Sequence, residues 1–290
     1  MKGIKFLVTR NFIKIFYYEG INIMLADFHI HTCFSGDSEA DVDKIIESAI
    51  EKGMRYMAIT DHNDFEFENG TFELDVERYF KCISDKKAEY KRQIQISVGI
   101  ECGLEPRYKN RIDNLLNAYN FDFVIGSSHV INGKDPYYKE YFEGRSVHEA
   151  MVEYLLSIEE NIDIFDNFDV YGHLDYMMRY APVPVTEKHY CYDEYGEYYE
   201  RILTKLINNG KGVEINTSAL KSGQLDTNPN FEVIKRYAEL GGKIITIGSD
   251  AHSPEYIGYG FEVAEYMLKK AGFTCCNIFE KRVAKPLQLL

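Results

Sequence analysis

Short apolar runs alternate along the chain with longer segments in which apolar residues recur at helical spacing. The runs predict buried strands at residues 23–31, 55–60, 94–100, 121–126, 168–172, 212–217 and 243–248. The segments between them predict helices near residues 74–91, 108–119, 146–163, 190–209 and 259–271. Strands that alternate with helices in this way are typical of a parallel sheet.

Two further helices begin at recognisable local signals. Ser38, with Asp41 three residues on, resembles a capping box, and the apolar residues that follow at helical spacing are Val42, Ile45, Ile46, Ala49 and Ile50. Asn228 is predicted to cap another helix, with Pro229 at its first position. With these two helices, seven strands alternate with seven helices.

Most of the apolar runs end in an imidazole or a carboxylate group. These groups belong to His29, His31, His62, Glu101, His129, His173, Asp250 and His252. Burial of an unpaired charge is costly, so the fold must supply each group with a partner. A single residue of this kind is more often a hydrogen-bonded structural group, but a shared metal cluster would satisfy all six strand ends at once. Imidazole and carboxylate are ligands of zinc, iron and manganese, so the sequence predicts a multinuclear metal enzyme.

The position of these groups favours one α/β architecture. Chemically active residues at the carboxyl ends of nearly every strand are typical of a closed (β/α) barrel, whereas an open sheet gathers them at one switch point. The longer loops near residues 62–73, 129–145 and 173–189 follow the same strand ends. We therefore expect these loops to build a substrate pocket.

Composition narrows the class of protein. The chain has 290 residues, 45% of them hydrophobic, which suits a single barrel domain over residues 24–290. Its net charge of −13 disfavours nucleic acid as a partner. The six cysteines show no CxxC pairing, which is typical of reduced thiols in a cytoplasmic protein, and no stretch of the sequence is long and apolar enough to cross a membrane.

Residues 1–23 form an extension before Met24, where the first functional strand begins. The extension lacks the apolar core and cleavage site of a signal peptide. We expect an upstream start or a dispensable arm. The alternative is an extra strand or helix that covers one end of the barrel or binds a partner.

The motifs together resemble the polymerase and histidinol phosphatase (PHP) domain over about residues 24–273. The resemblance lies in His29-Ile30-His31-Thr32 with Asp37, Thr60-Asp61-His62, Gly99-Ile100-Glu101, Ser128-His129, Gly172-His173-Leu174-Asp175 and Gly248-Ser249-Asp250-Ala251-His252. Within that superfamily, three segments are most similar to the histidinol-phosphatase branch: Val98-Gly99-Ile100-Glu101, Ile125-Gly126-Ser127-Ser128-His129 and the segment from Val170 to Tyr180.

The resemblance implies a distorted seven-stranded TIM-like barrel that binds three divalent metal ions of zinc, iron or manganese. The first ion would take His29, His31, Glu101 and Asp250. The second would share Glu101 as a bridge and add His129 and His173, and the third would take Asp37, His62 and His252. Of these ligands, the predicted catalytic residues are Glu101, Asp250 and His252. Asp61 and Asp175 are expected to orient the neighbouring imidazoles from behind.

The implied reaction is hydrolysis of a small phosphorylated metabolite, L-histidinol phosphate, through attack by a metal-bridging hydroxide. Arg179 is expected to hold the phosphate, and the alternative is that it forms a surface ion pair. Arg145, Lys134 and Arg107 are weaker candidates. The ammonium and imidazole groups of this substrate require acidic or aromatic partners. Suitable loops carry Asp64, Glu66, Glu105, Asp175 and Tyr176, among which the sequence does not choose.

Three alternatives remain open at this stage. A PHP phosphoesterase that acts on nucleotides, or a 3′-exonuclease, would share the metal ligands. A non-catalytic metal-binding scaffold is disfavoured by the complete ligand set. Amidohydrolase chemistry is disfavoured because Glu101 stands where that fold usually carries a metal-bridging lysine.

Overall fold

The main sheet is a barrel of parallel strands. A computed structural model describes residues 7–9, 12–14 and 25–290 of the chain. The strands, in the order in which they pair, are β10 (Ile245–Gly248), β9 (Gly212–Asn216), β8 (Val170–Tyr171), β7 (Phe123–Ser127), β6 (Gln95–Gly103), β4 (Tyr56–Ile59) and β3 (Ala26–Asp27). A short strand, β5 (His62–Asn63), also pairs with β6 in parallel.

The barrel closes between the residues that follow β3 and those at the end of β10. Phe28 N donates to Ile247 O at 2.9 Å, and His31 N donates to Ala251 O at 2.9 Å. Asp250 N donates in the opposite direction, to His29 O at 2.8 Å. The first and last strands are therefore neighbours, and the predicted seven-stranded barrel is confirmed.

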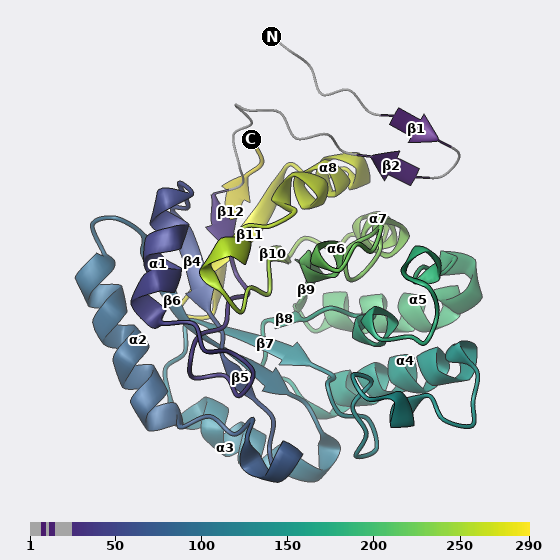
Figure 1. Cartoon of the computed structure of the whole chain (residues 1–290), viewed down its shortest axis with the longest axis horizontal. Coiled ribbons are helices and arrows are strands. Elements are labelled where there is room, and N and C mark those ends of the chain that lie inside the picture. The colour runs from purple at the N-terminus through teal and green to yellow at the C-terminus, as the bar shows by residue number, and fades with distance from the viewer. Residues whose placement is uncertain (1–6, 10–11, 15–24) are drawn as a thin grey trace.

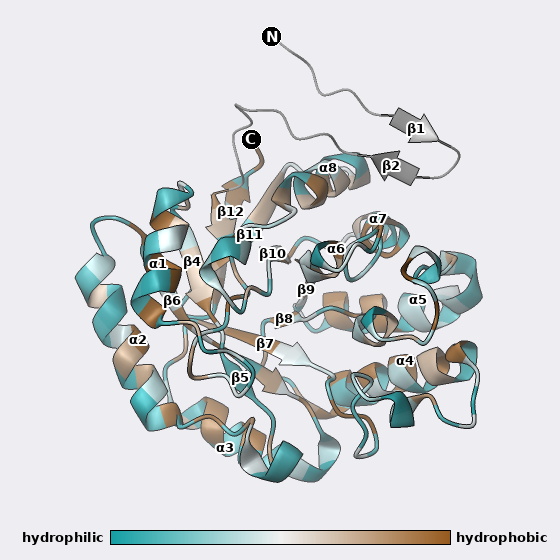
Figure 2. Cartoon of the chain, in the orientation of Figure 1, coloured by the Kyte–Doolittle hydropathy of each residue, from teal (hydrophilic) through white to brown (hydrophobic). Residues whose placement is uncertain are grey.

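Helices surround the strands, as Figure 1 shows. They are α1 (Val42–Glu51), α2 (Val76–Tyr90), α3 (Lys109–Ala118), α4 (Val147–Ile164), α5 (Tyr192–Asn208), the short α6 (Ser218–Lys221), α7 (Phe231–Glu239) and α8 (Phe261–Ala271). Short 3-10 helices occupy Phe67–Gly70, Pro106–Tyr108, Lys139–Tyr141, Tyr176–Arg179, Val185–Glu187 and Pro254–Tyr256. Figure 2 shows both hydrophilic and hydrophobic colours on the long helices, as expected for helices that bury one face.

Two predicted helix starts are corrected by the structure. Asp41 itself caps α1, because its side chain accepts from Lys44 N, while the hydroxyl of Ser38 donates to the carbonyl of His252. Asn230, rather than Asn228, caps α7 by accepting from Val233 N. In both cases the polar residue upstream of the true cap contacts residues at the mouth of the barrel, which no local pattern reveals.

A carboxyl-terminal hairpin, which the sequence pattern did not predict, packs against the amino-terminal end of the barrel. Its strands are β11 (Cys275–Glu280) and β12 (Val283–Gln288). Phe279 packs on Phe123 with 4.8 Å between ring centroids, and the Ser97 hydroxyl donates to Phe279 O at 2.6 Å. Ile278 is also buried there. The hairpin therefore covers the end of the barrel opposite to the strand ends that carry the chemical groups.

The amino-terminal extension is only partly described. It contains two short antiparallel strands, β1 (Leu7–Thr9) and β2 (Phe12–Lys14). Residues 1–6, 10–11 and 15–24 lie outside the described part of the chain. The division into an extension and one barrel domain, and the dispensability of the extension, stay predictions.

Two global expectations concern cysteines and membranes. None of the six cysteines, all of which lie in the described part of the chain, forms a disulfide. Among the described residues, no helix combines the length and apolarity required to span a bilayer.

Candidate metal centre

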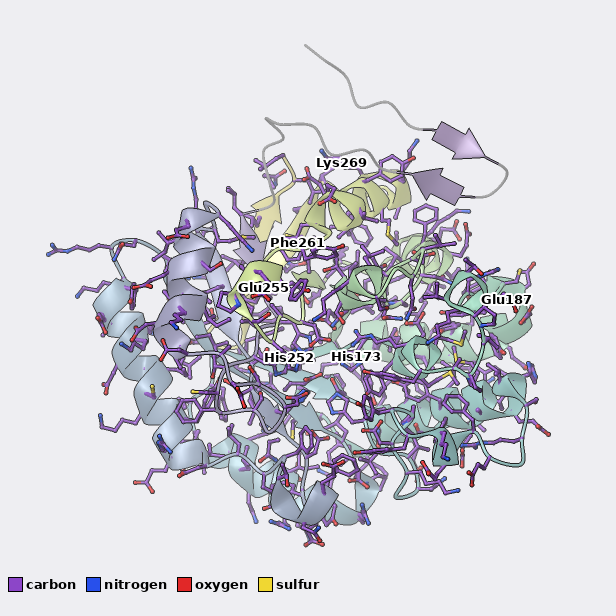
Figure 3. All side chains as sticks on the ribbon, viewed as in Figure 1. His173, Glu187, His252, Glu255, Phe261 and Lys269 are labelled. Atoms are coloured by element: carbon purple, nitrogen blue, oxygen red, sulfur yellow. The ribbon has the colours of Figure 1, made fainter. Side chains whose placement is uncertain are left out.

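The barrel brings the predicted strand-end residues to one mouth. His29 and His31 follow β3, His62 lies in β5, and Glu101 lies near the end of β6. The other members follow β7, β8 and β10, and they are His129, His173, Asp250 and His252. His173 and His252 lie near the centre of the ring in Figure 3.

Glu101 occupies the middle of this cluster and is fully buried. Its Oε2 lies 3.1 Å from His29 Nε2 and 3.6 Å from His31 Nε2. Its Oε1 lies 3.2 Å from His129 Nε2 and 2.9 Å from His173 Nε2. Oε2 also lies 2.9 Å from His62 Nδ1. Each oxygen therefore faces a different group of imidazoles, which is the arrangement that a bridging carboxylate requires.

Asp250 and Asp37 complete two further groups of ligand atoms. Asp250 Oδ1 lies 3.3 Å from His31 Nε2 and 3.9 Å from His29 Nε2. Asp37 Oδ2 lies 3.1 Å from His252 Nε2 and 3.7 Å from His62 Nε2. The structure thus gathers all nine residues that the resemblance suggested, in three neighbouring groups.

Several ligand atoms in the cluster are buried without a hydrogen-bond partner among the described residues. They are His29 Nε2, His31 Nε2, His62 Nδ1 and Glu101 Oε2. Buried polar atoms are almost always satisfied, so convergent lone pairs of this kind fit cations at the centre. One close group includes a residue that was not predicted as a ligand. Asp64 lies with His62 and His129, and their ligand atoms are within 4.8 Å of one another.

Electrostatics hold the carboxylates of the cluster in their ionised form. Burial opposes ionisation of Glu101, but the imidazoles of His29, His129 and His62 hold its pKa well below the usual range. Burial likewise opposes ionisation of Asp250, whose pKa His29 and Arg179 hold well below the usual range. Negative charge is thus retained in a buried site, as cation binding requires.

The imidazoles respond in two ways. Burial disfavours the charged form of His62, but Glu101 and Asp37 raise its pKa to about 9. Burial, reinforced by His252 and His62, holds the pKa of His31 well below its usual value. The His62 ring therefore favours the protonated form, and the neighbouring His31 ring favours the neutral form, which offers a lone pair.

Groups behind the cluster fix the orientation of several imidazoles. His29 Nδ1 lies 2.5 Å from Glu214 Oε1, and His129 Nδ1 lies 2.9 Å from Asp64 Oδ1. His31 Nδ1 lies 3.0 Å from the hydroxyl of Ser35. Partners at Nδ1 leave Nε2 turned toward the centre of the mouth.

The sequence pattern predicted this orienting role for Asp61 and Asp175, and the structure corrects the contacts. Asp61 accepts hydrogen bonds from Thr32 and Ser35, so it reaches an imidazole only through the Ser35 hydroxyl. Asp175 accepts from the side chains of Asn228 and Tyr190. Both carboxylates accept hydrogen bonds from side chains other than the neighbouring imidazoles.

Glu214 is the main residue that the sequence pattern missed. It is a buried carboxylate in the middle of β9, whose other central residues are apolar. A search restricted to strand ends passes over it. A lone glutamate inside an otherwise apolar strand was the available signal, since such a charge requires a buried partner.

A cavity of about 600 Å³ lies against this cluster of histidine and carboxylate side chains. Its walls come from the loops after β5, β7 and β8, as predicted, and also from α6. Of the predicted substrate contacts, the ones that line it are Asp64, Tyr176 and Arg179.

Of the four basic residues predicted for the phosphate, Arg179 is the one that lines the cavity. Its side chain is only 9% exposed, and its Nη1 donates to Asp250 Oδ2 at 2.8 Å. Arg179 therefore does form an ion pair, as the alternative interpretation expects, but the pair is buried at the cavity wall and not at the surface. The three weaker candidates are engaged elsewhere, with Arg145 on Glu153, Arg107 on Glu105 and Lys134 on the carbonyl of Glu140.

Asp135 is a second residue that sequence reasoning missed. It lines the cavity and is buried, and its Oδ1 accepts from Tyr137 N at 2.7 Å and from the Tyr176 hydroxyl at 3.3 Å. Burial raises its pKa to about 6. Tyr137, 60% exposed, lies beside it at the rim of the cavity. Among the many acidic residues of the loops, nothing local distinguished this one.

The fold and the cluster define a class of protein. The family model of the PHP domain matches residues 27–218, so the chain belongs to the PHP domain family.

Relatives of known or assigned activity are similar over most of the chain. A histidinol-phosphatase of Lactococcus lactis is 35% identical over 85% of this chain and 91% of its own length. A probable histidinol-phosphatase of Clostridium acetobutylicum is 32% identical over 90% of this chain and 99% of its own length.

A crystal structure of the histidinol phosphate phosphatase from Lactococcus lactis, complexed with zinc, L-histidinol and phosphate, superposes with a TM-score of 0.84. It is 33% identical in sequence and covers 90% of this chain and 98% of that one. The similarity therefore extends over most of the chain.

Proposed function

We propose that the chain is a histidinol-phosphatase, a phosphoric monoester hydrolase of histidine biosynthesis that converts L-histidinol phosphate to L-histidinol and phosphate. The observation that carries the proposal is a buried arginine, Arg179, on the wall of a cavity whose floor is the His, Asp and Glu cluster. Similarity to histidinol-phosphatases over most of the chain supports the same activity.

Three divalent cations are part of this proposal. The first set of residues is His29, His31, Glu101 and Asp250, the second is Glu101, His129 and His173, and the third is Asp37, His62 and His252. When bound, such cations offset the charge of a phosphate dianion and acidify coordinated water. We propose that Glu214, Ser35 and Asp64 hold the rings of His29, His31 and His129 in place.

Arg179 is proposed to hold the phosphate group. Its Nη2 is buried and has no hydrogen-bond partner within the described ranges, although the residue lines the cavity. A planar guanidinium at the cavity wall suits a phosphate oxygen that faces away from the cations. Its positive charge also stabilises the charge that develops as the ester bond breaks.

The cationic end of the substrate requires a carboxylate at the other side of the cavity. We propose Asp135 for the ammonium group, because this buried carboxylate faces the cavity and is held by the Tyr137 amide and the Tyr176 hydroxyl. The neighbouring rings of Tyr137 and Tyr138 offer aromatic surface for the imidazole.

The alternatives within the family differ in substrate rather than in metal ligands. A nucleotide or an oligonucleotide carries more negative charge than histidinol phosphate, and the cavity wall adds acidic side chains at Glu68 and Asp135 to a chain whose net charge is −13. The proposal therefore includes no nucleic-acid partner. A cytoplasmic location is a separate part of the proposal.

A substrate comparison tests the proposed function. Phosphate release is measured with L-histidinol phosphate, nucleoside monophosphates and a short single-stranded oligonucleotide at equal concentration. We expect kcat/KM to be highest for histidinol phosphate. Preferential hydrolysis of the nucleotide or the oligonucleotide would replace the proposal with one of the alternatives.

A further inference from the structure

A chain of hydrogen bonds runs from Asp175 to the guanidinium of Arg179. Asn228 Nδ2 donates to Asp175 Oδ1 at 2.6 Å, and Arg179 Nε donates to Asn228 Oδ1 at 2.7 Å. Asp175 is 2% exposed and Asn228 is 3% exposed. The amide of Asn228 therefore links two charged groups in the interior of the protein.

Asp175 determines which way the amide of Asn228 points. An ionised carboxylate can only accept, so the NH₂ group of Asn228 must face it. The other carboxylate oxygen, Oδ2, already accepts from the Tyr190 hydroxyl at 2.9 Å. The carbonyl oxygen of the Asn228 side chain consequently faces Arg179, where it can accept.

The backbone of Asn228 is fixed as well. Asn228 N donates to Asn216 O at 2.9 Å, and Asn216 N donates to Asn228 O at 2.8 Å. Asn216 is the last residue of β9, so this bridge attaches Asn228 to the rigid barrel. A side chain held at both ends in this way can orient its neighbour.

Two of the three guanidinium nitrogens of Arg179 are engaged by these partners. Nε donates to Asn228 and Nη1 donates to Asp250 Oδ2 at 2.8 Å. Because the guanidinium is planar, two fixed nitrogens set the direction of the third. That third nitrogen, Nη2, is the one left buried without a hydrogen-bond partner in the part of the chain that the structure describes.

We propose that Asn228, with its amide oriented by Asp175, is a positioning residue that holds the guanidinium of Arg179 in the orientation in which it binds the phosphate group of the substrate. The proposal rests on the proposed function, in which Arg179 binds that phosphate. The side-chain hydrogen bonds of Asn228 go to Asp175 and Arg179, and neither of these is a proposed metal ligand. We therefore expect Asn228 to affect phosphate affinity and not metal content.

The first test compares two asparagines of the same segment. Asn228→Ala should raise KM and the inhibition constant of inorganic phosphate by roughly tenfold, the scale on which outer partners of a site usually act, with unchanged metal content. Asn230→Ala is the matched control, because it removes the cap of α7 and leaves the contacts to Arg179 intact. Equal inhibition constants for Asn228→Ala and the wild type would overturn the proposal.

A charge-preserving exchange tests the orientation itself. Asn228→Asp alone sets two carboxylates against each other and should weaken phosphate inhibition at least as much as Asn228→Ala. The double variant Asp175→Asn with Asn228→Asp reverses donor and acceptor between the two positions but keeps an acceptor toward Arg179 and toward Tyr190. We expect the double variant to recover most of the phosphate affinity. A double variant that is as weak as Asn228→Asp, though folded by its unfolding transition, contradicts the inference.

Arg179→Ala separates this inference from the proposed function. If Arg179→Ala leaves the inhibition constant of phosphate unchanged, Arg179 does not bind phosphate, and both its proposed role and the positioning role of Asn228 are wrong, whereas the substrate comparison still decides the activity. If Arg179→Ala weakens phosphate binding while both Asn228 variants behave like the wild type, the function stands and the positioning role is wrong.

Discussion

Glu214 Oε1 lies 2.5 Å from His29 Nδ1, on the side of the imidazole that faces away from the metal cluster. The other oxygen of the same carboxylate accepts from the backbone N of His173 at 2.9 Å. His29 belongs to the first proposed set of ligands and His173 to the second. One buried carboxylate on β9 therefore fixes elements of two neighbouring metal sites.

The first prediction concerns this carboxylate. Glu214→Gln should lower metal affinity by roughly 10–100-fold, because a neutral amide holds the His29 ring less firmly and makes it a weaker ligand. Metal retained after dialysis against a chelator measures the change. Glu265→Gln is a suitable control, since this buried glutamate of α8 pairs with Lys269. Equal retention in Glu214→Gln and the wild type would show that the contact is not needed for binding.

Glu101→Gln should abolish phosphatase activity. The change removes the charge that lies between two groups of imidazoles, so at least one cation should be lost. Turnover and metal content are measured on the same sample. Near-normal turnover with full metal content would mean that Glu101 does not bridge.

Arg179→Ala should raise KM for histidinol phosphate and lower kcat while metal content stays intact. Loss of a preorganised donor of this kind costs about 2–4 kcal/mol of transition-state stabilisation. Arg145→Ala serves as the control, because its guanidinium pairs with Glu153 and lies outside the cavity wall. A similar defect in Arg145→Ala would move the phosphate contact to the loop after β7.

Asp135→Asn should raise KM for histidinol phosphate. The expected loss of binding free energy is about 1.5–3 kcal/mol, the usual range for a hydrogen bond to a charged group. Hydrolysis of p-nitrophenyl phosphate, which carries no ammonium group, should change little. Steady-state kinetics with both substrates provides the comparison. An equal loss with both would assign Asp135 to the phosphate or to the folded state instead.

The strand-end residues could be predicted from sequence because their chemical type and position both carry information. An imidazole directly after an apolar run, as at His173, points to the carboxyl end of a strand, and parallel strands bring such ends together. Eight of the nine residues gathered at the mouth were identified in this way, together with the barrel that holds them, whereas Asp37 was identified only through the resemblance to the PHP domain.

What the sequence could not reveal depends on tertiary contacts. Asn228 before Pro229 has the local pattern of a helix start, and only its contacts with Asp175 and Arg179 show another role. Glu214 was missed because its partner, His29, is far away in the chain. The β11–β12 hairpin follows the last barrel element, where the alternation of strands and helices gives no guidance.

Removal of residues 1–23 should leave activity and melting temperature close to those of the full chain. All residues proposed for the site lie between His29 and His252, so the extension supplies none of them. Activity and thermal unfolding of the shortened chain are compared with those of the full chain. A large loss of either would assign the extension a role at the barrel or in binding a partner.

Metal stoichiometry measured on active protein tests the site most directly. Protein purified without chelator is divided between elemental analysis and the phosphate-release assay with histidinol phosphate. Three divalent ions per chain are expected at full activity, since a smaller number leaves one of the sets built around Glu101, Asp250 and Asp37 without a cation. One ion per chain in fully active protein would be incompatible with the trinuclear centre.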